Sequence, residues 1–282
     1  MERHHLPAML FQRLNQSSIA QAIKARLFVF SPNHYSNHRW YGCYKLRELK
    51  RVLATPLPQE QLPPGYGRWL DERLVEYPWL FSQLTEDSGT LLDAGSTLNH
   101  ALILEHPRLR QRDITIMTLA PEEYRAENIT YVYGDLRHTS FRDNSFRTVV
   151  SLSVLEHIGM DTTRYAPGTS VAEAPQSYLD AVAEFRRVLK PGGSCLISVP
   201  FGKRGVRSWL QVFDAAMIAQ LVERFSPVWH AIQYFRYSAQ EQWERCGPAE
   251  AADASYFDLT SDTPWPKCPA GAGAVACLHL RK

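Results

Sequence analysis

Short apolar runs alternate with helical patterns through the middle of the chain, and this alternation limits the folds that the sequence can adopt. Each run is bounded by Gly, Pro, Asp or Asn. Apolar strands separated by helices are typical of a parallel sheet that is covered on both faces. The strands expected from this pattern are Thr90–Ala94, Asp113–Leu119, Ile129–Tyr133, Thr148–Leu152 and Ser194–Val199.

Two later apolar runs, Trp229–Phe235 and Gly273–Leu280, complete the expected sheet. If they pair with each other, the open sheet ends in an antiparallel edge. Prolines interrupt the polar stretch between them, so residues 240–270 are expected to form an inserted loop, a kind of segment that often carries specificity. The predicted fold is therefore α/β, with a doubly wound, mostly parallel, Rossmann-like sheet of seven strands, helices on both faces and an antiparallel edge strand.

Three stretches show apolar residues at helical spacing. The clearest is Tyr178–Leu189, which the turn residues Lys190–Gly193 are expected to end. Arg68–Leu84 and Tyr44–Leu53 show the same spacing. These stretches supply helices before and within the predicted sheet.

The first 65 residues differ from the rest of the chain. They are rich in Asn, His, Gln and Pro, and proline clusters separate them from the residues that follow. We therefore expect a partly helical N-terminal extension over residues 1–65 and one domain over residues 66–282, which contains the insertion. A lid, a dimer contact and a cap over a substrate are all open as roles for the extension.

Charge and cysteine content exclude several classes of partner. The 282 residues include 31 Lys and Arg against 29 Asp and Glu, a net charge of +2 that attracts neither nucleic acid nor an anionic membrane. Five cysteines without a Cys-x-x-Cys pair indicate neither a disulfide framework nor a zinc site. The N-terminus lacks a long apolar run, so the sequence favours a cytoplasmic location without a membrane partner.

The end of the first expected strand carries the first candidate site. In an open doubly wound sheet, the ligand lies outside the carboxyl ends of the strands. There the sequence reads Leu91-Leu92-Asp93-Ala94-Gly95-Ser96, with an acidic residue at the strand end followed by a glycine. Gly95 lets the backbone approach a ligand closely.

This stretch resembles the first motif of class I S-adenosylmethionine-dependent methyltransferases. Three more stretches resemble later motifs of that family in the same order: Gly134–Phe146, Ser151–Ile158 and Glu184–Gly193. The nearest subgroup is the type-11-like methyltransferase domain. The resemblance implies S-adenosylmethionine as the cofactor and a methyltransferase, of the EC 2.1.1 class, as the enzyme.

The resemblance also implies a set of cofactor-binding residues at the strand ends. Asp93, Gly95 and Ser96 would line the methionine side. Asp135 would accept the adenine amino group, and Leu136 would lie against the adenine ring. The full implied set is Asp93, Ala94, Gly95, Ser96, Asn99, Thr118, Leu119, Asp135, Leu136, Ser151 and Ser153.

Each of these assignments has a simpler alternative. Asp93 and Asp135 are also suited to turns or helix caps. Ser151 and Ser153, implied to form the floor beneath the sulfonium, are also ordinary polar residues at a strand end.

Three features depart from the family pattern, one of them being Arg147, which stands where the family commonly has Asp. Residues 96–99 replace the second and third glycines of the loop, and Asn99 is a candidate for one of them because Asn can adopt positive φ. Thr118 stands where the family places the acid that binds the ribose hydroxyls, and a hydroxyl makes a weaker hydrogen bond than a carboxylate. Glu122 or Glu123 could reach the ribose, although acids at a helix start often serve its dipole instead.

His157 and Glu156 are the catalytic candidates. They follow the fourth strand, where an acceptor should meet the methyl group for in-line transfer, and a hydroxyl acceptor needs a base. Capping of a helix is the alternative for both. Relatives with Glu-x-x-Glu-His here resemble magnesium users, but Ser153 takes the leading position, so no metal is predicted.

These patterns bear on three possible functions. The motifs favour methyl transfer from S-adenosylmethionine to a small-molecule or glycan-type acceptor. The altered glycine loop and the missing ribose acid favour the alternative of a noncatalytic binding or assembly module with the same fold. A nicotinamide-dependent oxidoreductase is disfavoured because no Gly-x-Gly-x-x-Gly follows the first strand.

Overall fold

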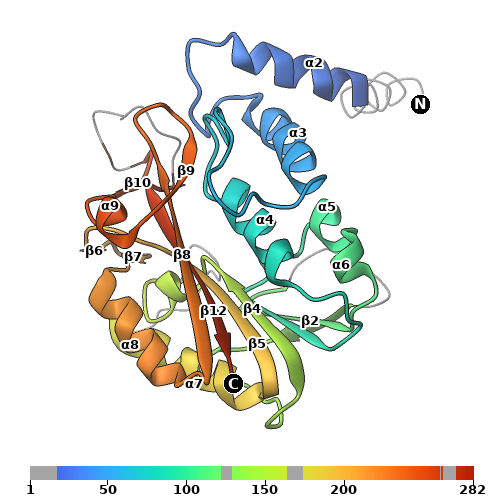
Figure 1. Ribbon diagram of the computed structural model, residues 1–282, viewed down its shortest axis with the longest axis vertical. Coiled ribbons are helices and arrows are strands. Elements are labelled where there is room, and N and C mark those ends of the chain that lie inside the picture. The colour runs from blue at the N-terminus through green and yellow to red at the C-terminus, as the bar shows by residue number, and fades with distance from the viewer. Residues whose placement is uncertain (1–17, 122–128, 164–173, 261, 263–270) are drawn as a thin grey trace, which may run out of the picture.

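The computed structural model describes residues 18–121, 129–163, 174–260, 262 and 271–282 (Figure 1). An eight-stranded sheet with the order β3-β2-β1-β4-β5-β12-β8-β9 forms its centre. The strands in that order are β3 (Ile129–Tyr133), β2 (Ile114–Thr118), β1 (Leu91–Ala94), β4 (Phe146–Leu152), β5 (Leu189–Pro200), β12 (Ala274–Arg281), β8 (Trp229–Tyr237) and β9 (Trp243–Cys246).

The sheet has a parallel and an antiparallel part. Strands β3 to β5 pair in parallel, whereas β12 runs antiparallel to both β5 and β8, and β9 runs antiparallel to β8. The α/β, mostly parallel, doubly wound fold is therefore confirmed. The expected count of seven strands is one too low, because β9 carries Glu244 and Arg245 at an edge and lacks the apolar run that predicts a strand.

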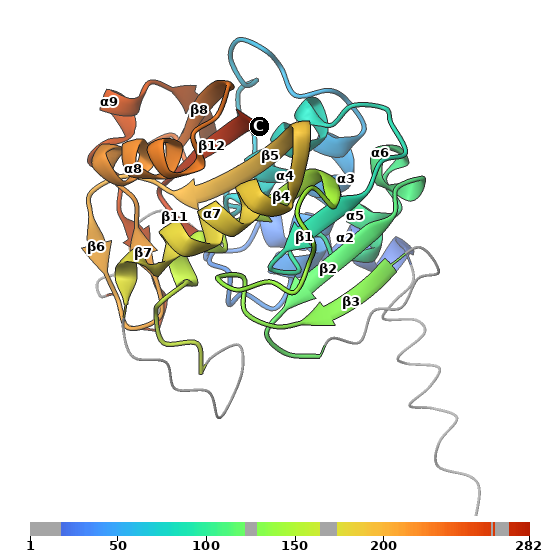
Figure 2. The same cartoon turned by 90° about the horizontal axis from the view of Figure 1, so that it is seen from below.

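Helices cover both faces of the sheet (Figures 1 and 2). One hydrophobic cluster joins Leu91, Val150 and Leu196 to residues from the N-terminal helices, and the other joins Val149 and Ile197 to residues from later helices. Alternate residues of one strand point to opposite faces, which explains why neighbours such as Val149 and Val150 enter different clusters. The helices on the first face are α2 (Ser18–Val29), α3 (Tyr41–Leu53), α4 (Arg73–Gln83), α5 (Ala101–Leu104) and α6 (Pro107–Arg110), and those on the second are α7 (Tyr178–Val188), α8 (Ala215–Phe225) and α9 (Pro248–Ala251).

Short elements connect these layers. They are the 3-10 helices η1 (Leu155–His157) and η2 (Pro175–Ser177), the hairpin of β6 (Gly205–Val206) with β7 (Gln211–Val212), and the pair β10 (Tyr256–Phe257) with β11 (Gly271–Ala272).

Helix α4 starts later than the spacing predicts. The pattern favours a helix from Arg68, but the helix begins at Arg73. Gly67 and Trp69 have φ values of 60° and 61°, in the left-handed region that a right-handed helix excludes. This start places the Arg73 side chain on the first turn of the helix.

The N-terminal helices contribute to the same hydrophobic cluster as α4 and the sheet. Phe28 of α2 is fully buried and stacks on Tyr44 of α3, with ring centroids 4.8 Å apart. The division at residue 65 stays a prediction. Across the described part of the chain, none of the helices combines the length and the apolar character that crossing a bilayer requires.

Candidate active site

A cavity of about 530 Å³ lies at the carboxyl ends of the parallel strands, and we call it the strand-end cavity. Its lining runs from Asp135, after β3, to Ser153, after β4, and includes Arg73 of α4. The strand order puts β2 and β1 between β3 and β4, so the cavity crosses three inter-strand steps, about 14 Å. The break in sequential order between β1 and β4 is the place where an open α/β sheet binds its ligand.

Asp93 organises the loop that follows β1. Its side chain is fully buried and accepts hydrogen bonds from the backbone N–H groups of Thr97 (3.2 Å) and Leu98 (2.8 Å). Tyr77 of α4 donates to the carbonyl of Thr97 over 2.7 Å. The buried carboxylate thus fixes the backbone of the loop after β1. This is the role of a turn residue, which is the alternative that the sequence offered for Asp93.

The loop itself turns at Gly95 and Ser96. Both have positive φ, 120° and 63°, and a side chain at Gly95 would collide with Val154. The sequence singled out Asn99 for positive φ, and this is wrong: Ser96 is the non-glycine residue of this loop with positive φ. Asn99 instead accepts a hydrogen bond from Tyr131 of β3 over 2.9 Å.

One end of the strand-end cavity carries an ion pair of Asp135 and Arg137. Arg137 donates from its side chain to both carboxylate oxygens of Asp135, at 2.6 to 3.0 Å. Burial acts to raise the pKa of Asp135, but the hydrogen bonds from Arg137 outweigh it and hold that pKa below its ordinary value. Asp135 is therefore a charged acceptor at neutral pH, and Leu136 and Met117 supply apolar surface beside it.

The other end carries a cation that the sequence analysis missed. The Arg73 guanidinium lies 2.7 Å from the Glu76 carboxylate and donates to the carbonyl of Leu152 at the end of β4. Burial acts to lower the pKa of Arg73, but Glu76 and the other acidic side chains around it, Glu72 and Asp71, together with Tyr77, outweigh burial and raise that pKa. A permanent positive charge therefore stands at this end of the cavity.

Glu76 joins α4 to two strand ends. Its Oε1 accepts hydrogen bonds from Ser153 Oγ, after β4, and Ser198 Oγ, in β5, both at 2.6 Å. Ser153 has a φ of 49°, a backbone conformation that costs a non-glycine residue free energy and persists where the surroundings impose it. No local pattern signals this network, because Glu76 is 77 residues from Ser153 and 122 from Ser198.

His157 lines the cavity near Ser153 and Arg73. Its Nδ1 lies 2.8 Å from the backbone carbonyl of Trp209, which can only accept, so Nδ1 carries the proton of the neutral ring. Nε2 is then the basic nitrogen.

Glu156 differs from its neighbour. Its side chain is buried, and burial raises the pKa of its carboxyl well above the ordinary value. Burial thus favours the protonated form of this carboxyl, and its Oε1 lies 3.8 Å from His157 Nε2.

The structure brings about half of the sequence-predicted site residues to the strand-end cavity. Those in its lining are Gly95, Thr118, Leu119, Asp135, Leu136, Ser153 and His157. Those outside its lining are Asp93, Ala94, Ser96, Asn99, Ser151 and Glu156. The roles of both groups stay predictions.

Ser151 and the ribose acids need separate mention. Ser151 is fully buried in β4, and its hydroxyl has no hydrogen-bond partner among the described residues. Glu122 and Glu123 lie outside the described residues. Among the residues that are described, no group of three or more His, Cys, Asp or Glu side chains is placed to hold a metal ion, and the absence of a metal from the mechanism stays a prediction.

The chemistry of the cavity fits a nucleoside that carries an amino-acid tail. Asp135 can accept from an exocyclic amine, the apolar side chains beside it suit a base, and Arg73 can pair with a carboxylate. The volume lies within the range of sites for small ligands and cofactors.

Comparison with known protein families gives a match in the middle of the chain. Residues 111–197 match the family whose model is described as "Methyltransferase domain". The resemblance seen in the sequence is therefore confirmed, and the cofactor of that family is S-adenosylmethionine. The first motif, Leu91–Ser96, precedes the matched span.

Solved structures with low similarity come from several methyltransferases. A Burkholderia thailandensis 1,6-didemethyltoxoflavin-N1-methyltransferase with bound 1,6-didemethyltoxoflavin and S-adenosylhomocysteine is 13% identical, with a TM-score of 0.45, over 94% of this chain and 91% of that one. A protein from Galdieria sulphuraria, provisionally described as a sarcosine dimethylglycine methyltransferase, is 19% identical, with a TM-score of 0.41, over 56% of this chain and 63% of that one. This chain thus covers less than two thirds of the Galdieria protein.

A S-adenosylmethionine-dependent methyltransferase from Methanosarcina mazei is 14% identical, with a TM-score of 0.43, over 73% of this chain and 97% of that one. No curated protein sequence matches the chain.

Proposed function

We propose that the protein transfers a methyl group from S-adenosylmethionine to a small-molecule or glycan-type acceptor, by in-line displacement. The observation that carries the proposal is the strand-end cavity, with an anion at one end, a cation at the other and His157 of η1 in its lining. The near-zero net charge supports an acceptor other than nucleic acid. We also propose a cytoplasmic location.

Each end of the cavity has a role in this proposal. Asp135 would accept the adenine amino group, and Arg73 would pair with the carboxylate of the methionine tail. Thr118 would hydrogen-bond the ribose more weakly than a carboxylate does. When bound, S-adenosylmethionine supplies an electrophilic methyl group.

His157 would act on the acceptor. Its Nε2 would take the proton of an acceptor hydroxyl, while the hydrogen bond from Nδ1 to the Trp209 carbonyl keeps the ring oriented. Glu156 is the weaker catalytic candidate because its carboxyl is buried outside the lining of the strand-end cavity and burial raises its pKa.

One observation favours the second candidate, a noncatalytic module. Both oxygens of Asp135 already accept hydrogen bonds from Arg137 in the structure. Adenine binding must share or displace these hydrogen bonds.

Calorimetric titration with S-adenosylmethionine and S-adenosylhomocysteine tests the two candidates. We expect micromolar affinity, about −8 kcal/mol, for the wild type and a large loss in Asp135→Ala. Asp253→Ala is the matched control, because Asp253 is exposed and lies outside the lining of the strand-end cavity. Absence of binding by the folded wild type would establish the noncatalytic module instead.

A further inference from the structure

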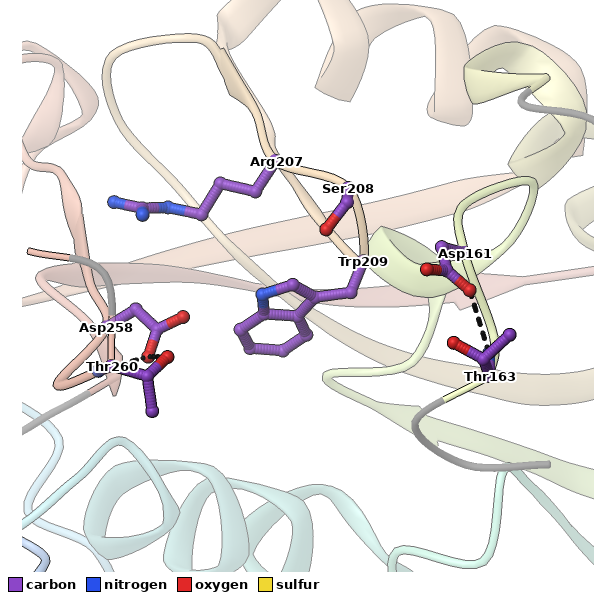
Figure 3. A pocket seen from close by; sticks show the side chains of 7 residues that line it. All are labelled: Asp161, Thr163, Arg207, Ser208, Trp209, Asp258 and Thr260. Atoms are coloured by element: carbon purple, nitrogen blue, oxygen red, sulfur yellow. Dashed lines mark hydrogen bonds between the residues drawn. The ribbon is translucent and has the colours of Figure 1, made fainter. Parts of the chain in front are cut away.

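A second cavity of about 550 Å³ lies beside η1, and we call it the loop cavity (Figure 3). Three separate loops supply its lining. Asp161 and Thr163 follow η1, Arg207, Ser208 and Trp209 come from the hairpin of β6 and β7, and Asp258 and Thr260 follow β10. The last pair belongs to the segment that the sequence marked as an insertion.

The loop cavity and the strand-end cavity share a wall. His157 lines the strand-end cavity, and its ring stacks on Trp209, with centroids 5.4 Å apart and planes at 12°. The segment after η1 also separates the two cavities, because its residues line them in turn. Thr162 lines the strand-end cavity, whereas Asp161 and Thr163 line the loop cavity. The Trp209 indole is therefore the side chain that lies between a ligand in the loop cavity and His157, the proposed base.

The indole of Trp209 is held in place before any ligand arrives. Its hairpin is closed by a hydrogen bond from Arg207 N to Leu210 O (2.8 Å), and Asp161 N donates to Ser208 O (2.8 Å). Tyr256 meets the indole edge-on at 5.6 Å. An ordered aromatic side chain loses little conformational freedom on binding, which favours affinity.

Arg207 is fixed as well. Its guanidinium donates to both oxygens of Asp262, at 3.0 and 2.7 Å, and to the carbonyl of Tyr256. This bidentate pair joins the hairpin to the segment after β10. The positive charge of Arg207 is thereby balanced by a carboxylate next to the loop cavity.

The lining is suited to hydroxyl groups. Three of its side chains, Thr163, Ser208 and Thr260, both donate and accept hydrogen bonds, and two carboxylates accept. Trp209 is the one aromatic side chain among the lining residues and lies between the two carboxylates (Figure 3). An anionic ligand would meet both carboxylates, while Arg207 is already paired with Asp262. A cationic ligand would pair with the carboxylates but makes no use of the three hydroxyl side chains, whereas a neutral ligand that carries several hydroxyls bonds to both kinds of group.

We propose that the loop cavity binds a neutral sugar ring of the methyl acceptor, with the apolar face of the ring on Trp209 and its hydroxyls on Asp161, Asp258 and the neighbouring hydroxyl side chains. The assignment rests on the proposed function in one respect, that the bound ring belongs to the acceptor. It narrows the acceptor class from small molecules in general to carbohydrates.

Ligand-observed saturation-transfer NMR on the full chain tests this assignment directly. The probes are the methyl glycosides of glucose, galactose, mannose and rhamnose, with choline as a cation and methyl glucuronide as an anion. We expect at least one neutral glycoside to bind with a Kd of about 1 mM. We expect Trp209→Ala to weaken that binding about tenfold or more and Trp209→Phe, which keeps an aromatic face, to retain most of it.

Two further variants complete the design. Trp229→Ala removes an indole that is 47% exposed on β8, outside the loop cavity, and should leave glycoside binding unchanged. Asp161→Asn keeps an oxygen to accept from the Thr163 N–H but removes the charge, and it should weaken glycoside binding about threefold. Thermal unfolding of each variant checks that the fold is intact.

The outcomes separate this inference from the proposed function. Binding of choline or of the glucuronide alone, or no glycoside binding by the folded wild type, overturns the carbohydrate assignment. A separate titration with S-adenosylhomocysteine reports on the cofactor. Glycoside binding without S-adenosylhomocysteine binding would support the sugar site and contradict the methyltransferase proposal. S-adenosylhomocysteine binding without glycoside binding would contradict only the sugar site.

Discussion

The two ends of the strand-end cavity hold the same kind of ion pair in different surroundings. Glu76, the partner of Arg73, is fully buried and also accepts from two serine hydroxyls. Asp135, the partner of Arg137, has 39% of its side chain exposed. A buried, fully hydrogen-bonded pair is costly to break, whereas an exposed pair exchanges partners with little loss.

This difference in burial gives the two carboxylates different roles. At the buried end, the carboxylate is the scaffold, and it presents the Arg73 cation at the cavity. At the exposed end, the carboxylate itself lines the cavity, and Arg137 keeps it charged. The predictions below test this contrast.

Removal of the buried carboxylate should have the largest effect. Glu76→Ala leaves the Arg73 charge and the hydroxyls of Ser153 and Ser198 without their acceptor, so we expect a loss of about 3 to 5 kcal/mol in the free energy of unfolding, measured in urea. Glu76→Gln, which keeps an acceptor oxygen, should lose less. A loss below about 1 kcal/mol in Glu76→Ala would contradict the role of Glu76 as the scaffold.

Arg73 should distinguish ligands by their tails. Arg73→Gln is expected to weaken S-adenosylhomocysteine binding by about 2 kcal/mol, roughly thirtyfold, because a charged hydrogen bond to the tail carboxylate is lost. Binding of 5′-methylthioadenosine, which has no amino-acid tail, should stay unchanged in the same calorimetric assay. Arg73→Lys serves as the charge-conserving control. Equal weakening of both ligands would show that Arg73 acts on the fold and not on the tail.

Glu156→Gln should stabilise the protein at neutral pH. The folded state holds a proton on Glu156 where the unfolded chain has lost it, so wild-type stability falls by about 1.4 kcal/mol for each pH unit above the ordinary pKa until the raised pKa is reached. Glutamine carries no such penalty, and its advantage should disappear near pH 4. Urea unfolding at several pH values measures this difference. A destabilised variant at pH 7 would mean that Glu156 is ionised and paired with His157.

The smallest effect is expected at the exposed pair. Arg137→Ala should change the free energy of unfolding by about 0.5 kcal/mol, because both side chains are partly solvated. The pKa of Asp135 should rise toward its ordinary value, as measured by NMR titration, since the hydrogen bonds that lower it are gone. Loss of S-adenosylhomocysteine binding in this variant would instead make Arg137 a ligand contact, and the two ends would then be alike.

Much of the fold could be predicted because its signals are local. The apolar runs that became β1 to β5, β8 and β12 are bounded by turn residues within a few positions of each strand end. Strand β9 was not predicted because it lacks an apolar run. Its edge position allows the charged residues Glu244 and Arg245. The predicted start of α4 at Arg68 was wrong because Gly67 and Trp69 adopt left-handed backbone conformations.

The residues of the candidate site also divide into those that local sequence signals predict and those that they do not. Asp135, Leu136 and His157 follow strand ends, and parallel strands bring all such ends to one edge, so sequence order was enough to place them together. Arg73 and Trp209 lie on segments that carry no part of the family's motifs. Only the packing of α4 and of the β6–β7 hairpin brings them to the cavities.

The sequence by itself determined the parallel sheet and the order of the residues along its carboxyl edge, because periodicity and turn residues act over a few positions. The tertiary structure alone decided which side chains are exposed and which partners they have. It buried Asp93 beneath the loop that it organises, gave Ser96 the left-handed conformation and raised the pKa of the Glu156 carboxyl. Burial and long-range hydrogen bonds set these properties, and both depend on segments that are distant in the chain.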